Sequence, residues 1–297
     1  MSRSGHRLQM AAVKAAFAAG LAGVGIAVLA LWTAPASGQA AASDAPAAGP
    51  AAPLASAAAG SALPDSRRSG FDFMGASTQA MQRNDSLNPG MLWIQGGEAL
   101  WKQPAGASNK SCASCHGDAN ASMRGVAARY PAFDEVQKRP TTLGQRIDQC
   151  RQNKQQAPPL KPESEAQLSL ESYVAHQSRG LPVAPPDDAR LAASRRKGEQ
   201  LFNQPLGQLG LSCAQCHDAN AGKRLGGSTI PQGHANGYPL YRLEWQTLGS
   251  LQRRLRNCMS GVRAEPFAFG APELVELELY LAKRGAGLMV EVPAVRP

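Results

Sequence analysis

The sequence predicts an all-α protein built from two tandem domains of related sequence. Three observations lead to this fold class. Helix-forming stretches alternate with irregular, glycine-rich loops; no segment shows the apolar–polar alternation of a half-buried strand; and one set of short segments occurs twice in the same order. A chain of 297 residues is also long enough for about two domains.

The internal repeat is the strongest of these observations. Its two copies lie 101 residues apart at their first cysteines, Cys112 and Cys213. Five pairs of segments match in the same order: 97–101 with 198–202, 111–116 with 212–217, 130–131 with 238–239, 142–144 with 247–249, and 170–174 with 277–281. Five matches in one order favour duplication of a domain over chance similarity.

Composition excludes several classes of protein. Aromatic residues make up 5% of the chain and charged residues 18%, and there are only six cysteines. Four of these cysteines belong to two Cys-x-x-Cys-His strings, which leaves two single cysteines. A disulfide-knotted small protein, a collagen-like chain and a polytopic membrane protein are therefore not expected.

Residues 1–40 have the features of an export signal peptide. Three basic residues precede an apolar stretch over 15–32, and small residues follow it. The competing interpretation is an uncleaved membrane anchor, because the stretch approaches the ~20 residues that span a bilayer. Cleavage lowers the formal charge from +9 to +6, so no nucleic-acid partner is expected. Export predicts a periplasmic protein in an oxidising compartment.

Composition also suggests the domain boundaries. Residues 41–70 are rich in alanine and proline and are expected to form a disordered tether. Residues 71–180 are expected to form the first domain, 181–188 a proline-rich linker, and 189–297 the second domain.

The clearest predicted helix spans residues 272–284. Pro272 suits a first helical position, Glu273 suits the positive end of the helix dipole, and Gly285 can end the helix. Its buried stripe is expected to comprise Leu274, Leu277 and Leu281.

Cys-x-x-Cys-His is the attachment string of c-type haem. Two thiols one helical turn apart can add to the two haem vinyl groups, and the adjacent histidine then lies under the iron. Two strings at matching positions of a repeat favour two covalently bound c-type haems over a redox pair or half of a zinc site. Each domain is therefore expected to be cytochrome c-like. The strings are Cys112, Cys115 and His116 in the first domain, and Cys213, Cys216 and His217 in the second.

The single cysteines are the matched candidates for the distal iron ligands. Cys150 and Cys258 follow the first cysteine of their own domain by 38 and 45 residues. The methionine and histidine candidates do not match between the halves: Met123, Met259, Met289, His176 and His234. The alternative is a disulfide between Cys150 and Cys258, which an oxidising compartment favours.

Residues 254–267, around Cys258, resemble the signature of the SoxA family of bacterial thiosulfate oxidation. Segments 88–93, 97–101 and 277–281 resemble the same family. The resemblance covers roughly residues 71–287 and is most specific around Cys258.

The resemblance implies an enzymatic function, L-cysteine S-thiosulfotransferase. The family pairs with a small monohaem cytochrome subunit, SoxX, in a heterodimer. The pair joins thiosulfate to a cysteine of the carrier protein SoxYZ and removes two electrons. By this resemblance Cys258 is the catalytic, persulfide-bearing residue and a distal haem ligand, and Arg254 binds the substrate. Two haem strings and Cys150 identify the chain with the dihaem members of the family.

The residues around Cys258 agree with this chemistry. Arg253, Arg254, Arg256 and Arg263 lie near it in sequence. On a helix Arg254 shares a face with Cys258, whereas Arg256 points elsewhere. A guanidinium suits a multi-oxygen anion, and positive charge favours the reactive thiolate.

The first domain is less cationic at the matching place. Arg146 occupies the position four residues before Cys150, but Asp148 and Gln149 replace Arg256 and Asn257. No catalysis is therefore assigned to Cys150. Two other functions fit the haem strings alone: a dihaem electron carrier without catalysis, and a dihaem peroxidase, whose open iron a thiolate ligand would block.

Overall fold

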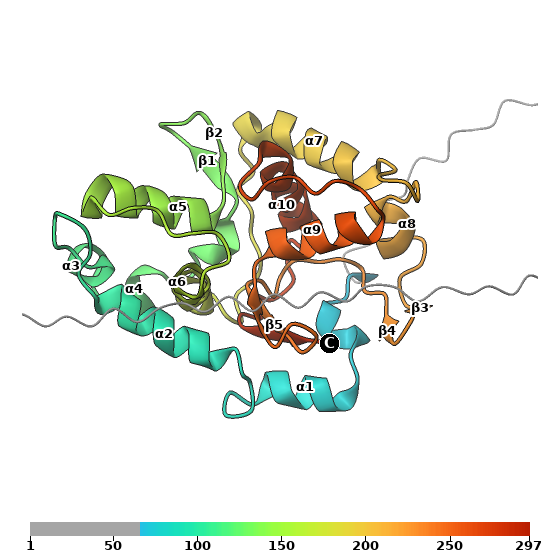
Figure 1. The fold of residues 1–297 in the computed structure, drawn as a ribbon, viewed down its shortest axis with the longest axis horizontal. Coiled ribbons are helices and arrows are strands. Elements are labelled where there is room, and N and C mark those ends of the chain that lie inside the picture. Colours follow the sequence, from blue (N-terminus) through green and yellow to red (C-terminus); the bar gives the residue numbers. More distant parts are fainter. Residues whose placement is uncertain (1–65) are drawn as a thin grey trace, which may run out of the picture. The chain divides into compact units, whose positions relative to one another are not determined.

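The computed structural model describes residues 66–297 (Figure 1). The predicted signal peptide at 1–40 and most of the predicted tether lie outside these residues. The described chain is mostly helical. Its α-helices are α1 (Ala76–Arg83), α2 (Met91–Lys102), α3 (Cys112–His116), α4 (Ala119–Ser122), α5 (Leu143–Cys150), α6 (Glu165–His176), α7 (Ala192–Asn203), α8 (Cys213–His217), α9 (Leu251–Gly261) and α10 (Pro272–Arg284).

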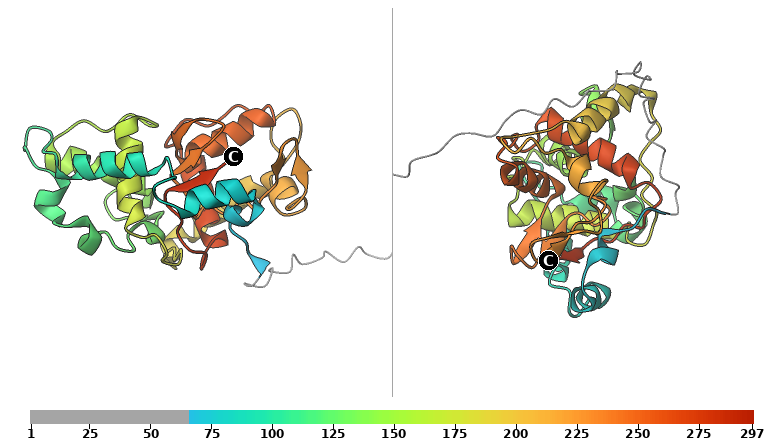
Figure 2. Two further views of the ribbon diagram at one scale, coloured as in Figure 1. Left: turned by 90° about the horizontal axis from the view of Figure 1, so that it is seen from below. Right: turned by 90° about the vertical axis from the view of Figure 1, so that its right-hand side faces the viewer.

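Short helical turns complete the helical part. Their bounds are η2 (Gly70–Phe73), η3 (Ala127–Arg129), η4 (Arg151–Gln155) and η5 (Ala189–Leu191). Elements α2–α6 and elements α7–α10 lie side by side as two groups in Figure 1 and in the left view of Figure 2. None of the helices within residues 66–297 combines the length and the apolar character needed to cross a membrane.

A tight helix crossing holds each half together. In the first half α2 packs on α6, and in the second α7 packs on α10. A glycine allows each approach: a Cβ added to Gly97 would lie 2.5 Å from the Cβ of Tyr173, and one added to Gly198 would lie 2.9 Å from the Cβ of Tyr280. These distances are far below van der Waals contact, so the two equivalent glycines position the two crossings.

We expect Gly97→Ala to lower the free energy of unfolding by about 1–3 kcal/mol, because the added methyl group overpacks the crossing. Gly96→Ala is the matched control on the same helix, since its Cβ would meet only the Ser169 side chain, with Oγ at 3.3 Å and Cβ at 3.7 Å. Alanine is the better helix former, so the Gly96 variant should equal or exceed the wild type. Thermal unfolding of the haem-loaded protein measures both effects, and equal effects of the two variants would contradict the role of the crossing.

The all-α prediction was wrong in one respect, because the described chain also contains short strands. Two of its sheets are antiparallel hairpins, β1 (Ala132–Asp134) with β2 (Arg139–Thr141) and β3 (Arg224–Leu225) with β4 (Ser228–Thr229). The third sheet has the order β6 (Thr247–Gly249), β5 (Leu240–Arg242), β7 (Ala294–Arg296), with β7 parallel to β5. Strands of two or three residues are too short to show apolar–polar alternation, so the sequence pattern could not reveal them.

The structure corrects one match of the sequence repeat. Thr142 is the N-cap of α5, and its equivalent is Ser250, the N-cap of α9, rather than Thr247. Cys150 and Cys258 then both lie eight residues after the cap of their helix. Residues 247–249 form β6, whose counterpart is β2.

The predicted last helix is confirmed. Helix α10 spans Pro272–Arg284 with proline in its first turn, and the backbone N–H of Gly285 donates to the last turn. The predicted stripe is buried, with exposures of 0% for Leu274, 1% for Leu277 and 4% for Leu281.

Both predicted domain edges make contacts that the sequence did not suggest. Within the predicted linker, Val183 N donates to Leu288 O, and Gly287 N donates back to Val183 O. Near the beginning of the described chain, Gln82 Oε1 accepts from Val295 N at 3.0 Å. Segments before and between the two halves are therefore tied to the last residues of the chain, and the domain boundaries stay a prediction.

Candidate functional site

The two Cys-x-x-Cys-His strings form the short helices α3 and α8. Ser111 caps α3 by accepting from Ser114 N at 3.0 Å, and Ser212 caps α8 by accepting from Gln215 N at 3.2 Å. The caps start each helix at its first cysteine, so both cysteines of a string lie one turn apart. This is the spacing that two thioether bonds to one macrocycle require.

His217 is held in a defined orientation. Its Nδ1 donates to the carbonyl oxygen of Pro231 at 2.7 Å. Gly233 lies so close that a Cβ there would be 2.9 Å from Cγ of the His217 ring. With Nδ1 engaged by a carbonyl, Nε2 is the nitrogen left for a metal, which is the usual arrangement behind a ligating histidine.

Cys258, on α9, contacts the His217 ring across the second half. Burial raises the pKa of the Cys258 thiol, but His217, Arg254 and Arg242 together lower it more, so the pKa lies below its ordinary value. This environment favours the thiolate, which is the nucleophilic and metal-binding form of cysteine.

The first half presents a different environment to Cys150. Burial raises the pKa of Cys150, and the charges of Arg146 and Lys154 do not offset it. The Arg146 guanidinium is 3.0 Å from the buried carboxylate of Asp134, which neutralises it. The two cysteines therefore occupy equivalent positions with opposite pKa directions, as the predicted difference in local charge implies.

Only Arg254 of the four predicted arginines has its charge directed to Cys258. Arg253 instead lies 3.9 Å from Glu163 and stacks on the Trp245 ring, and Arg263 is exposed. Arg256 donates to the carbonyl oxygen of Phe267, so it points away as predicted.

Arg254 itself has no carboxylate within ion-pair distance anywhere in residues 66–297. Burial lowers the pKa of Arg254, but the neighbouring Cys258 and Tyr238 raise it further, so the side chain is charged. It is a cation beside Cys258 with no carboxylate partner among residues 66–297, which suits an anionic substrate.

Sequence reasoning missed two neighbours of Cys258, Tyr238 and Arg242. Burial raises the pKa of Tyr238, which lies near both Arg254 and Cys258. Tyr238 and Pro239 match Tyr130 and Pro131 of the first half, and this match was the available sequence signal for Tyr238. Arg242 belongs to no sequence motif, and its proximity depends on β5, which the sequence did not reveal.

The other candidate iron ligands do not occupy matched positions in the two halves. Met289 is 55% exposed. His234 Nε2 lies 3.3 Å from Gln232 Oε1, and Met259 is buried in the second core. The matched cysteines are thus the better-supported candidates.

The donor set fits c-type haem in each half. Cys112 and Cys115 lie near enough to Cys150 for their charges to affect one another, and His217 faces Cys258. All six cysteines are free in the structure, so Cys150 and Cys258 form no disulfide. A group of three His, Cys, Asp or Glu side chains, as a zinc site needs, does not occur in the described part of the chain.

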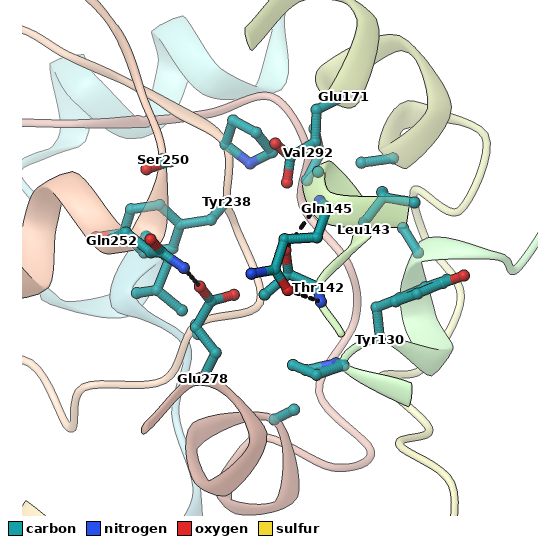
Figure 3. A pocket seen from close by; sticks show the side chains of 18 of the residues that line it. Tyr130, Thr142, Leu143, Gln145, Glu171, Tyr238, Ser250, Gln252, Glu278 and Val292 are labelled. Atoms are coloured by element: carbon teal, nitrogen blue, oxygen red, sulfur yellow. Dashed lines mark hydrogen bonds between the residues drawn. The ribbon is translucent and has the colours of Figure 1, made fainter. Parts of the chain in front are cut away.

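A cavity of about 270 Å³ lies between the two halves, away from both strings (Figure 3). Equivalent residues line it from the two sides, including Tyr130 with Tyr238 and Glu171 with Glu278. Gln252 Nε2 donates to Glu278 at 2.7 Å, whereas Glu171 has no hydrogen-bond partner within the described residues.

Burial raises the pKa of both cavity carboxyls. The pKa of Glu171 rises to about 8, because Glu278, Glu163 and Asp148 add negative charge to the effect of burial. The pKa of Glu278 rises to about 7, with the Gln252 hydrogen bond opposing the effect of burial.

These pKa values predict that stability falls as the pH rises. Between about pH 4.5 and 8 the folded state holds more protons on Glu171 than the unfolded state does, so the free energy of unfolding decreases through this window. We expect Glu171→Gln to raise the melting temperature at pH 8 and to leave it unchanged at pH 5. The exposed Glu265→Gln is the control, with no effect at either pH. A gain that is equal at pH 5 and pH 8 would show that the carboxyl is not neutral in the fold.

The comparisons with known proteins agree with this geometry. A family model described as SoxA/TsdA, cytochrome c domain, matches residues 96–183 and again residues 197–290. The two matches enclose the two strings and the two single cysteines.

Similar proteins include two described as L-cysteine S-thiosulfotransferase subunit SoxA. The one from Pseudaminobacter salicylatoxidans is 42% identical over 234 residues, covering 78% of the chain and 82% of that protein. The one from Rhodovulum sulfidophilum is 38% identical over 235 residues, covering 78% and 81%. Among solved structures, SoxXA from P. pantotrophus matches with a TM-score of 0.75 and 33% identity, over 78% of the chain and 87% of that chain.

Proposed function

Because the chain belongs to the SoxA family of cytochrome c-domain proteins, we propose that it is the catalytic subunit of an L-cysteine S-thiosulfotransferase. The substrates are thiosulfate and a cysteine of a SoxYZ-like carrier protein, and the reaction belongs to sulfur oxidation. The observation that carries the proposal is the Cys258 thiolate beside the charged Arg254.

Two c-type haems are assigned, one to each half. Cys112 and Cys115 would hold the first haem, and Cys213 and Cys216 the second. His116 and Cys150 would bind the iron of the first haem, and His217 and Cys258 that of the second. When bound, the haem supplies one-electron redox chemistry beside Cys258.

In the proposed reaction, Arg254 and Cys258 of the second half have separate roles. Arg254 binds the sulfonate of thiosulfate and directs the outer sulfur towards Cys258. The Cys258 thiolate forms a bond to that outer sulfur, and the two electrons released pass to an external acceptor, the partner cytochrome. The carrier thiol gives its proton to solvent, its thiolate attacks the same sulfur, and the Cys258 thiolate is released. The carrier cysteine ends with the thiosulfonate group, so atoms and charge balance.

The proposed function implies two protein partners and a periplasmic location for the chain. A SoxX-like monohaem cytochrome is the expected partner subunit, supported by the similarity to SoxXA from P. pantotrophus. A SoxYZ-like carrier brings the acceptor cysteine. The export signal predicted for residues 1–40 places the protein in the periplasm, and nothing in the function requires nucleic acid.

Reconstitution with the two partners tests the proposal. Thiosulfate should reduce haem and add a thiosulfonate group to the carrier cysteine, as read by absorption and by mass spectrometry of the carrier. Haem that an artificial donor reduces, together with an unmodified carrier, would instead identify a dihaem electron carrier. A spectral change on adding peroxide would favour the peroxidase alternative.

A further inference from the structure

The same strand–helix unit occurs in both halves and carries the single cysteine. β1 and β2 lead into α5 in the first half, and β5 and β6 lead into α9 in the second. In the first hairpin Asp134 lies opposite Arg139, and in the second Arg242 lies opposite Thr247. Asp134 and Arg242 are therefore equivalent: each is the last residue of its strand and faces the first residue of the next.

The helix arginines are equivalent as well. Arg146 and Arg254 each lie four residues after the N-cap of their helix and four residues before its cysteine. The two units thus place the same three functional positions together: a strand-end residue, a helix arginine and a cysteine.

In the first half the strand-end residue neutralises the helix arginine. Asp134 Oδ2 lies 3.0 Å from Arg146 Nη2, and the Asp134 side chain is 1% exposed. Its other oxygen accepts from the backbone N–H groups of Val136 and Gln137, at 2.8 and 2.7 Å. A fixed carboxylate therefore occupies the place beside Arg146 that an anion would need.

In the second half the same position adds positive charge. The Arg242 side chain is only 14% exposed, and one end of its guanidinium lies 2.7 Å from the largely exposed Glu244. Its Nε is buried and has no hydrogen-bond partner among residues 66–297. The charges of Arg242 and Arg254 both lower the pKa of Tyr238, so the two side chains lie near the same ring.

Two positively charged groups near one place favour the binding of an anion there. The contact in the first half shows that the strand-end position reaches the helix arginine. A sulfonate has three oxygens, and these can accept hydrogen bonds from the planar guanidinium groups of two arginines. Arg242 also has an unused buried donor, and the cost of leaving it unpaired is removed when an anion accepts from it.

We propose that Arg242 is a second sulfonate-binding side chain of the Cys258 site, acting together with Arg254. This inference rests on the proposed function and adds to it the residue that makes the site selective for a polyoxyanion on sulfur. The carboxylate of Asp134 at the equivalent position makes the Cys150 site unreceptive to the same anion.

Thiosulfate titration of the reconstituted haem-loaded complex tests the proposal with three variants. We expect Arg242→Gln to raise KM for thiosulfate about tenfold, equal to ~1.4 kcal/mol, with little change in kcat. Arg242→Lys, which keeps the charge and loses the fork, should raise KM by less. Asp134→Asn is the matched control at the equivalent position, because it keeps the oxygen that accepts from Val136 and Gln137, and its KM should equal that of the wild type.

The outcomes are distinguishable. A wild-type complex that does not modify the carrier contradicts the proposed function itself. If the wild type is active, an unchanged KM in Arg242→Gln contradicts the role of Arg242. An equal rise in KM in Asp134→Asn would show a general effect of strand-end substitution and would also overturn it. If Arg242→Gln yields no folded haem protein, Arg242→Lys is measured instead. An unchanged KM in that variant contradicts binding of the sulfonate by the Arg242 guanidinium.

Discussion

Cys258→Ala is expected to abolish thiosulfate transfer to the carrier, lowering kcat by roughly 10³-fold or more, as loss of a nucleophile does in other enzymes. The reason is local: the neighbouring His217, Arg254 and Arg242 stabilise the thiolate of this cysteine. The attachment cysteines lie on α8, separate from α9, so the haem should stay covalently bound. Carrier modification and haem absorption, measured on the same sample, check both parts.

Cys150→Ala is the matched control, because Cys150 lies at the same place on the equivalent helix. Its thiol has a raised pKa, and its arginine is paired with Asp134. We expect this variant to change the spectrum of the first haem and to keep substantial activity. Full activity in Cys258→Ala, or complete loss in Cys150→Ala alone, would contradict the assignment of the two cysteines.

Arg254→Ala has the second largest expected effect. Removing a charged hydrogen-bond donor to the sulfonate should cost about 1.5–3 kcal/mol, which corresponds to a decrease in kcat/KM of roughly 10–10²-fold. Because Arg254 also stabilises the Cys258 thiolate, the loss should appear in kcat as well as in KM. Steady-state kinetics with varied thiosulfate measures the two effects separately.

Arg253→Gln is the control for this substitution. Arg253 is the adjacent residue on α9, but it contacts Glu163 and the Trp245 ring rather than Cys258. It removes the same charge from the same helix and should leave kcat/KM within about twofold. Equal losses in the two variants would indicate a diffuse electrostatic effect rather than binding by one side chain.

The candidate site was predictable from sequence to the extent that its chemistry is local. Cys-x-x-Cys-His carries the haem geometry within five residues, and its caps Ser111 and Ser212 are adjacent. Arg254 and Cys258 are four residues apart on one helix, so helical periodicity alone places them on one face. In the structure the strings form α3 and α8, and Arg254 and Cys258 both lie on α9.

The position of Arg242 could not be predicted from the sequence, because it depends on the pairing of two strands. Arg242 reaches the site because β5 aligns it against β6, and strands of three residues leave no periodic signal. The match of residues 142–144 with 247–249 followed residue identity, whereas the helix caps that define the true equivalence are threonine in one half and serine in the other.

The cavity between the halves was equally hidden. Glu171 and Glu278 look like surface carboxylates in sequence, because their helices carry polar residues on several faces. Their raised pKa values arise only when the two halves come together and exclude water.

A crystal structure of the haem-loaded complex with its SoxX-like partner, soaked in thiosulfate, tests the central claim most directly. The account predicts an iron between His217 and Cys258, and thiosulfate with its sulfonate on Arg254 and its outer sulfur at the Cys258 sulfur. Thiosulfate bound beside Cys150 and Arg146, or an iron in the second half ligated by a residue other than Cys258, would contradict it.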